Sequence, residues 1–268
     1  MLYYVPPEEK LKIVRFVSRD IIKYGILDGD TVRGYTGSPF DKLKNFSADG
    51  TTYGFNEIKL LAPCEPSKIV CLGLNYRSHI KEVGFQEPDE PLMFLKPSTS
   101  VIGPEDNIIL PKFPVKSRVD YEGEVGVVIG KQAKDVAEDL ALEYILGYTC
   151  VNDVSARYYQ KKDVQWTRAK SFDTFCPIGP CIADIENPDK IGLETLINGK
   201  VCQSSNTSYL IFSIRKLVSF ISGVMTLLPG DIISTGTPEG IGPLQAGDVI
   251  EIKVEGVGTL KNYVKDKN

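Results

Sequence analysis

The stretch Asp120-Tyr121-Glu122-Gly123-Glu124-Val125-Gly126-Val127-Val128-Ile129 begins with carboxylates and ends as an apolar strand. Alternate residues of a strand share a face, so Asp120, Glu122 and Glu124 are expected to line up on one side. Acidic side chains beside a buried segment repel each other and lose hydration unless something positive lies among them. Gly123 has no side chain on the opposite face, where another backbone can approach closely.

A half-exposed strand with a solvated acidic face is the alternative, because acidic residues usually face water. A second acidic residue in an apolar setting argues against it: Asp153 follows a predicted buried strand, Ile145–Val151. A carboxylate at that position needs a partner. Oxygen ligands of this kind favour Mg²⁺, Mn²⁺ or Ca²⁺. Glu122, Glu124 and Asp153 therefore predict a three-carboxylate metal site on two strands, with water in the remaining positions.

The rest of the chain reads as strands with few helices. The turn Asp28-Gly29-Asp30 predicts a hairpin over residues 24–35. The two prolines of Pro63-Cys64-Glu65-Pro66 discourage regular structure and suggest a boundary. Residues 1–62 are interpreted as a small N-terminal β unit, and residues 63–268 as the main domain.

In the main domain, Asn198-Gly199 between apolar flanks predicts a second hairpin. Helices are expected over 135–144, with Asp135 near the N-cap, and over 207–222, with Gly223 as the C-terminal cap. No regular alternation of strands and helices is present. The pattern favours a mixed α+β, β-rich chain with a mixed or antiparallel core.

Bulk properties exclude several classes of function. The 268 residues are 42% hydrophobic, enough for a full core, and the net charge of −4 gives no general attraction to nucleic acid or anionic membrane. No apolar run approaches the roughly 20 residues of a membrane span, and the N-terminus lacks the pattern of a signal peptide, so a cytoplasmic protein is expected. Six cysteines without a Cys-x-x-Cys pair are expected to be reduced. A single histidine makes zinc improbable.

That histidine, His79, lies three residues before Glu82, so the two side chains face the same way on a helical turn. A carboxylate that accepts the imidazole N–H fixes the tautomer and makes the other nitrogen a better base. The following loop, 83–91, suggests a movable lid. An incidental ion pair on a surface turn is the alternative, because His-x-x-Glu is a common pattern.

Over nearly all of residues 60–265 the chain resembles the fumarylacetoacetate hydrolase superfamily. The matching pieces occur in family order, and their combination is specific although each is weak alone. They are Gly73-Leu74-Asn75-Tyr76 with His79 and Glu82, Asp120–Glu124, Asn152–Arg157, Ala169–Phe175, Asn198-Gly199 with Gln203, Pro229-Gly230-Asp231 and Thr235–Gly240. The namesake eukaryotic hydrolase has an additional Asp ligand upstream of its histidine, and Ile69-Val70-Cys71-Leu72 offers none. The resemblance is therefore to the shorter prokaryotic-type members.

The resemblance implies a β-rich sandwich-like roll, a homodimer and roles for nine residues. The metal ligands would be Glu122, Glu124 and Asp153, holding Mg²⁺ (with Mn²⁺ or Ca²⁺ as alternatives). The base pair that activates water would be His79 and Glu82. The groups that contact the substrate or stabilise an oxyanion would be Lys170, Arg157, Gln160 and Thr237.

The expected activity is hydrolysis of a C–C bond in an acylpyruvate-like or fumarylpyruvate-like diketo acid, through a metal-bound enolate. An isomerase of 2-hydroxyhepta-2,4-diene-1,7-dioate, or a decarboxylase of oxaloacetate-like 2-oxo acids, would use the same residues. The alternative from another class is a non-catalytic, Ca²⁺-stabilised binding protein. Three carboxylates are few for a dedicated Ca²⁺ cage, and the His79–Glu82 pair would then have no task.

Overall fold

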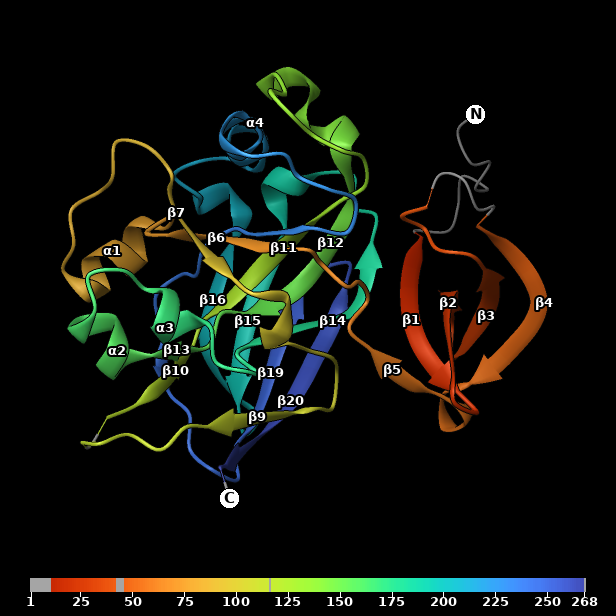
Figure 1. The fold of residues 1–268 in the computed structure, drawn as a ribbon, viewed down its shortest axis with the longest axis horizontal. Coiled ribbons are helices and arrows are strands. Elements are labelled where there is room, and N and C mark those ends of the chain that lie inside the picture. The colour runs from red at the N-terminus through yellow and green to blue at the C-terminus, as the bar shows by residue number, and fades with distance from the viewer. Residues whose placement is uncertain (1–10, 42–45, 116, 268) are drawn as a thin grey trace.

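The computed structural model describes residues 11–41, 46–115 and 117–267, and it is β-rich with few short helices, as expected (Figure 1). Its strands form three sheets. Within the described residues, no helix is long and apolar enough to cross a membrane.

The largest sheet runs in the order β4-β3-β2-β1-β14-β12-β11-β17-β6-β7, with β5 beside β1 and β8 beside β14. Neighbouring strands are antiparallel, apart from the parallel pairs β17–β6 and β14–β8. The strands are β1 Lys12–Ser18, β2 Ile21–Asp28, β3 Thr31–Thr36, β4 Ser47–Gly54, β5 Lys59–Leu61, β6 Ile69–Gly73, β7 Leu92–Lys96, β8 Val101–Ile102, β11 Gly123–Ile129, β12 Ile145–Asn152, β14 Cys176–Ala183 and β17 Ile232–Ser234.

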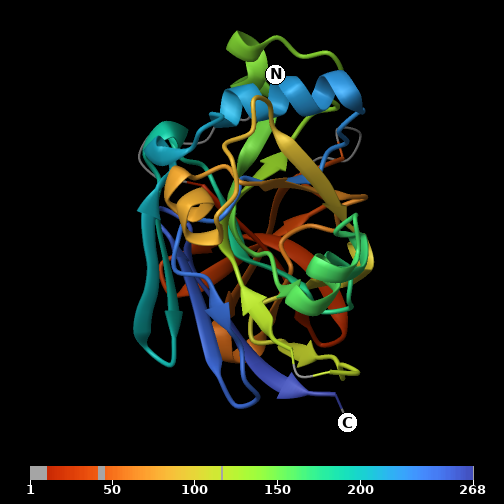
Figure 2. The same cartoon turned by 90° about the vertical axis from the view of Figure 1, so that its left-hand side faces the viewer.

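A second sheet has the order β16-β15-β19-β20-β9 and packs face to face on β11, β12 and β14 (Figure 2). A small third sheet, β13-β10-β18, lies beside the site described below. The strands of these sheets are β9 Asn107–Leu110, β10 Val119–Tyr121, β13 Ser155–Ala156, β15 Gly192–Ile197, β16 Lys200–Asn206, β18 Gly242–Pro243, β19 Val249–Val254 and β20 Gly258–Asp266.

Four α-helices and five 3₁₀ turns complete the described chain, and α4 lies across one end of the sandwich (Figure 2). They are α1 Arg77–Val83, α2 Arg157–Lys162, α3 Thr167–Lys170, α4 Ile214–Val224, η1 Phe55–Glu57, η2 Ser98–Ser100, η3 Glu138–Tyr144, η4 Pro188–Lys190 and η5 Thr207–Tyr209.

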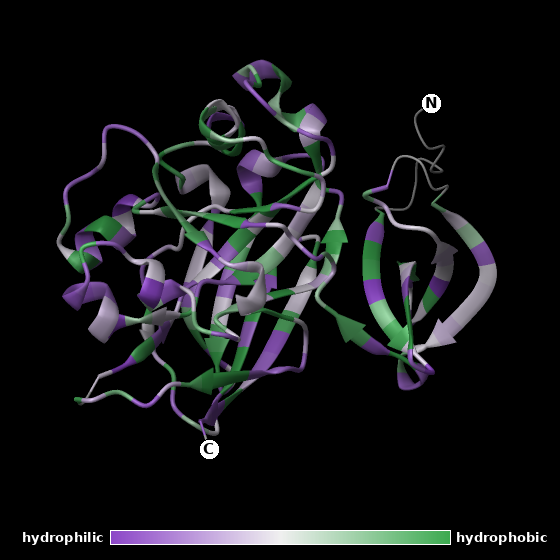
Figure 3. Cartoon of the chain, viewed as in Figure 1, coloured by the Kyte–Doolittle hydropathy of each residue, from purple (hydrophilic) through white to green (hydrophobic). Residues whose placement is uncertain are grey.

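Burial explains the apolar patterns. Every residue of β11 is buried, because β11 lies inside the large sheet and under the second one, so it reads as a continuous apolar run. In β19 buried residues alternate with partly exposed ones, as in a sheet with one covered face. Figure 3 shows apolar stretches along the central strands, interrupted by polar residues, and polar residues on many of the surrounding loops.

Both predicted hairpins are present. β2 pairs with β3 from Asp28 opposite Thr31, and β15 pairs with β16 from Ile197 opposite Lys200. In the second turn, Asn198 and Gly199 both have positive φ, which the two-residue turn requires. The strands β1–β4 lie to one side of the main body, joined to it where β1 pairs with β14 (Figure 1). The division at residues 62 and 63 stays a prediction.

Two helix predictions were wrong at their ends. The segment expected over 135–144 is a 3₁₀ turn that begins at Glu138, and Asp135 has a φ of 50° instead of capping it. The helix expected over 207–222 begins only at Ile214, because the Ser213 hydroxyl accepts from the N–H of Lys216 and caps it there.

The segment before α4 is not helical and is held by hydrogen bonds to another part of the chain. The peptide N–H groups of Ile211 and Phe212 bond to the backbone and side-chain oxygens of Asn75, which lies far away in the sequence. At the other end, Gly223 lies inside α4, and Met225 forms the C-cap. Helical spacing alone predicted the apolar face correctly but not these tertiary hydrogen bonds.

The close approach predicted at Gly123 is present. A Cβ at this position would lie 2.0 Å from Thr195 Oγ1 and 3.1 Å from Gln203 Oε1, both from the facing sheet. Gly123→Ala is therefore expected to lower the free energy of unfolding by about 3 kcal/mol, the upper end of the range for overpacking. Urea denaturation of the metal-free protein measures this change.

Gly223→Ala is the matched control, because nothing lies within 4 Å of a Cβ there and the residue is helical. It should leave stability unchanged or raise it by up to about 1 kcal/mol. Equal effects of the two substitutions would mean that the facing sheet shifts freely and that Gly123 is not a packing requirement.

Candidate metal centre and active site

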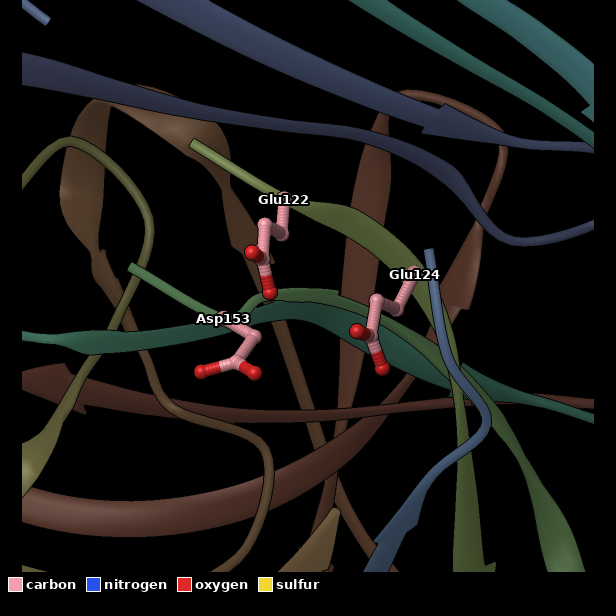
Figure 4. A group of neighbouring side chains, drawn as sticks. All are labelled: Glu122, Glu124 and Asp153. Atoms are coloured by element: carbon pink, nitrogen blue, oxygen red, sulfur yellow. The ribbon is translucent and has the colours of Figure 1, made fainter. Parts of the chain in front are cut away.

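Three carboxylates come together where β11 begins and β12 ends (Figure 4). Gly123 pairs with Asn152, and the N–H of Asp153 donates to the backbone oxygen of Glu122 at 2.8 Å. This register brings Glu122, Glu124 and Asp153 side by side. One oxygen from each lies within 4.8 Å of the others, and all three residues are buried.

Asp120 is not one of the three grouped carboxylates, although the side chain of Arg157 contacts both Asp120 and Glu122. The strand is interrupted at Glu122, so Asp120 lies in β10 of the small sheet while Glu124 lies in β11. Its Oδ2 accepts from Arg157 Nε at 2.7 Å and from Arg118 Nη2 at 3.0 Å. Asp120 thus holds Arg118 and Arg157, and Arg157 links it to Glu122.

Three cations contact two of the three carboxylates, Glu122 and Asp153. Lys170 Nζ lies between Glu122 Oε2, at 2.8 Å, and Asp153 Oδ2, at 2.6 Å. Arg157 Nη2 donates to Glu122 Oε1 at 2.5 Å. Lys96 Nζ contacts Asp153 Oδ1 and donates to the Val154 carbonyl at 3.0 Å. Glu122 and Asp153 are therefore paired with cations as well as buried, whereas the described residues give Glu124 no ion pair.

Sequence reasoning missed Lys96. It is the last residue of β7 and is 1% exposed, and its acidic partner lies 57 residues away. The available signal was a lysine that ends the mostly apolar run 92–96 and precedes a proline. A buried lysine requires a carboxylate partner, but the sequence does not show which one.

Burial and neighbouring charges shift the pKa values of the residues in this group. Burial raises the pKa of Glu124, and the nearby Asp153 and Glu122 raise it further, to about 8. Burial acts in the same direction on Glu122, but Lys170 and Arg157 outweigh it and hold the pKa of Glu122 well below its usual range. The pKa of Lys170 is raised: burial lowers it, and the attraction of Asp153 and Glu122 more than compensates. Negative charge is therefore in excess around Glu124.

The donor set fits a divalent cation that prefers oxygen. Glu124 Oε2 accepts from Ser234 Oγ at 2.5 Å and from the N–H of Gly236 at 2.8 Å, which leaves Oε1 without a hydrogen-bond partner in the described chain. A cation at this point would relieve the excess negative charge. Carboxylates on rigid strands suit Mg²⁺ or Mn²⁺, which use few protein ligands and keep several waters.

His79 and Glu82 lie together on α1. His79 Nδ1 lies 3.0 Å from Glu82 Oε2, and because a carboxylate accepts, Nδ1 carries the proton and Nε2 is the free nitrogen. Glu82 Oε1 accepts from the N–H of Gly240 at 3.0 Å, which fixes the carboxylate from the other side. His79 is 8% exposed. The pair is held in one orientation and is not an incidental surface contact.

One cavity of about 780 Å³ brings the predicted residues together. It is lined by eight of the nine: His79, Glu82, Glu122, Glu124, Arg157, Gln160, Lys170 and Thr237. The ninth, Asp153, is not in the lining but accepts a hydrogen bond from the lining residue Lys170 at 2.6 Å. Arg118 and Lys161 also line the cavity and had not been predicted.

Two of the residues predicted to contact the substrate already make hydrogen bonds within the protein. Gln160 Oε1 accepts from Arg157 Nη1 at 2.6 Å, which turns the amide nitrogen away from that contact. The Thr237 hydroxyl accepts from Gln203 Nε2 at 2.8 Å and donates to the carbonyl of Gly123 at 2.9 Å. Thr237 therefore braces the strand that carries the two glutamates in addition to lining the cavity.

A β-rich fold with a group of three carboxylates and a His–Glu pair defines the class of protein, and sequence comparison identifies the family. The profile for the fumarylacetoacetate (FAA) hydrolase C-terminal domain matches residues 68–265, so the chain belongs to this family. A second profile, for the Rv2993c-like N-terminal domain, matches residues 11–63.

Relatives differ in the reaction they catalyse. The structure of 5-carboxymethyl-2-hydroxymuconate delta-isomerase from Mycobacterium smegmatis is 44% identical with a TM-score of 0.87, covering 96% of this chain and 100% of that one. Oxaloacetate tautomerase YisK from Bacillus subtilis is 41% identical over 84% of this chain and 78% of its own. Maleylpyruvate hydrolase from Sphingobium sp. SYK-6, solved with manganese(II) and pyruvate, is 28% identical with a TM-score of 0.79, covering 96% and 100% of the two chains.

Proposed function

We propose that this chain is a divalent-metal-dependent enzyme that moves a proton on and off the enolate of a small 2-oxo acid, as a tautomerase or isomerase. The observation that carries the proposal is that one cavity is lined by the His79–Glu82 pair and by two members, Glu122 and Glu124, of the three-carboxylate group. The similarity to an isomerase and a tautomerase at more than 40% identity supports proton transfer as the first candidate, ahead of hydrolysis.

The metal would be held by Glu122, Glu124 and Asp153. When bound, Mg²⁺ or Mn²⁺ would chelate the carboxylate and the 2-oxo group of the substrate and stabilise negative charge on the enolate oxygen. Lys170 and Arg157 would add positive charge on the substrate side of the carboxylates, since both line the cavity.

His79 would be the group that handles the proton. Its Nε2 would accept a proton from the carbon next to the 2-oxo group and return it at another position. Glu82 holds the opposite nitrogen, and the Gly240 N–H holds Glu82, so the imidazole keeps its orientation and gains basicity. Phe94 and Trp166 line part of the cavity and restrict water there.

Hydrolysis of a C–C bond in an acylpyruvate-like or fumarylpyruvate-like diketo acid is the second candidate, favoured by the likeness to maleylpyruvate hydrolase. In that reaction His79 would deprotonate water, which attacks the distal carbonyl, and Lys170, Arg157 and Gln160 would stabilise the oxyanion. Decarboxylation of oxaloacetate would require the same enolate stabilisation but no water.

A turnover screen under Mg²⁺ separates these reactions. Oxaloacetate is assayed for keto–enol conversion and decarboxylation, 2-hydroxyhepta-2,4-diene-1,7-dioate for isomerisation, and acetylpyruvate and fumarylpyruvate for cleavage. We expect proton transfer to be the fastest reaction. Faster cleavage would establish the second candidate, and inertness of every compound with metal bound would reject both.

A further inference from the structure

The loop that follows β17, residues 235–240, contacts both halves of the site. Near its start, the N–H of Gly236 donates to Glu124 Oε2 at 2.8 Å, and at its end the N–H of Gly240 donates to Glu82 Oε1 at 3.0 Å. Glu124 belongs to the carboxylate group, and Glu82 holds the imidazole of the single histidine. The 235–240 loop therefore contacts the metal group at one end and the base pair at the other.

The side chain of Gln203, in β16, holds the middle of this loop. Its Nε2 donates to Thr237 Oγ1 at 2.8 Å and to the carbonyl of Pro238 at 2.9 Å. Its Oε1 accepts from the N–H of Gly123 at 2.9 Å. These partners fix the orientation of the amide, because an N–H must meet an acceptor and a carbonyl must meet a donor. Gln203 is 1% exposed and does not line the cavity.

The bond to Gly123 replaces a missing strand neighbour. β11 pairs with β17 from Gly126 to Val128, and Gly123 lies before this pairing begins. Gly123 is buried, and a buried backbone group without a partner is destabilising. Its N–H donates to Gln203, and its carbonyl accepts from the Thr237 hydroxyl at 2.9 Å. The two side chains close a ring of hydrogen bonds around the glycine that separates the two glutamates of the metal group.

The end of the loop is packed directly against the same strand. A Cβ at Gly240 would lie 2.1 Å from the carbonyl oxygen of Cys202 and 3.2 Å from Gln203 Cγ. On its other side, the Tyr121 hydroxyl donates to the carbonyl of Gly240 at 2.9 Å. The N–H that holds Glu82 therefore belongs to a peptide whose place depends on β16 and on Gln203.

We propose that Gln203 is a positioning residue that couples the metal group to the base pair through the 235–240 loop. It touches neither the substrate nor the ion. By holding the middle of the loop, it sets the position of both N–H groups, the one that meets Glu124 and the one that meets Glu82. The inference rests on the proposed function, because it takes Glu124 as a metal ligand and His79 as the base. Loss of the Gln203 amide should weaken metal binding and loosen the imidazole together.

The single histidine gives a readout that does not depend on turnover. Nitrogen NMR of protein with isotope-labelled histidine distinguishes the protonated ring nitrogen from the free one. At mildly alkaline pH and without metal, the wild-type protein should show one tautomer with the proton on Nδ1, because Glu82 accepts it. Gln203→Met, which removes the amide at nearly constant size, should show a mixture of both tautomers. Calorimetric titration should show Mg²⁺ binding weakened by about 10- to 100-fold, the usual effect of removing a residue that orients metal ligands.

Asn262→Leu is the matched control. Asn262 is also 1% exposed, and its Nδ2 donates to the carbonyl oxygens of Gly103 and Asp106, at 2.8 and 3.0 Å. It does not line the cavity. The control removes a buried amide with two donors, so it should lower stability while Mg²⁺ affinity and the single tautomer stay as in the wild type. Equal changes in the two variants would mean general loosening and would overturn the coupling.

Gln203→Asn covers the case in which Gln203→Met does not fold. It keeps the amide but is one CH₂ shorter, so it should show the same two changes to a smaller extent. Wild-type Mg²⁺ affinity with a single tautomer, or a change in only one of the two measurements, would overturn the coupling alone. No binding of Mg²⁺ or Mn²⁺ by the wild type would overturn the proposed function and the coupling together. If both changes occur but every 2-oxo acid is inert with wild-type protein, the proposed function alone fails.

Discussion

Glu124→Gln is expected to abolish every reaction of the protein on 2-oxo acids, by at least about a thousandfold, because stabilisation of enolate charge by a metal contributes several kcal/mol. The substitution keeps the size of the side chain. Its amide oxygen can still accept from Ser234 and from the Gly236 N–H, so the NH₂ group would face the ion in place of Oε1. The effect should therefore be on metal affinity and turnover, with the fold retained.

Calorimetric titration with Mg²⁺ and Mn²⁺ and steady-state kinetics measure the two quantities. Chelator-treated wild-type protein should be equally inactive and should recover when Mg²⁺ or Mn²⁺ is added. Glu138→Gln is the control, because Glu138 is exposed in η3 and does not line the cavity. Full activity in excess EDTA would remove the metal assignment.

His79→Ala is expected to lower kcat/KM for proton transfer or hydrolysis by roughly 10² to 10⁴, the usual range for a positioned acid–base group. Glu82→Gln should cost less, because Glu82 only orients and tunes the imidazole. Metal affinity should be unchanged in both variants, since neither residue belongs to the carboxylate group. Glu87→Gln, in the loop after α1, is the control for loss of an acidic residue near this helix.

Comparison with decarboxylation makes the base assignment testable. Release of CO₂ from oxaloacetate needs the stabilised enolate but no base acting on carbon or water, so His79→Ala should spare it more than the other reactions. Glu124→Gln should abolish both. If His79→Ala reduced the two activities equally, His79 would act in closure or binding, and the role of general base would have to be withdrawn.

Much of the site could be predicted from sequence because its residues are close together in the chain or at the ends of recognisable strands. Glu122 and Glu124 flank one glycine, and Asp153 ends an apolar run, so the sequence alone indicated them as metal ligands. The sequence did not indicate which reaction the site would catalyse. A carboxylate group and a base serve several reactions of one enolate, and the choice depends on the shape and charge of the cavity.

The missed features depend on partners remote in sequence. Lys96 is explained only by Asp153, and Arg118 only by Asp120 and by its cross-strand neighbour Arg157. The interruption of the strand at Glu122, which separates Asp120 from Glu124, arises because β10 and β11 join different sheets. Alternation along one strand cannot reveal that change of partner.

Because the ammonium groups of Lys96 and Lys170 are buried beside the carboxylates, folding of the protein should not depend on binding of the metal ion. They balance much of the charge on Glu122 and Asp153, so the polypeptide should reach its native state with the ion absent and accept it afterwards. The same balance weakens the pull on an incoming cation. The ion should then exchange readily with the surrounding medium, and the fraction of working molecules should follow the free concentration of Mg²⁺ or Mn²⁺ where the protein operates.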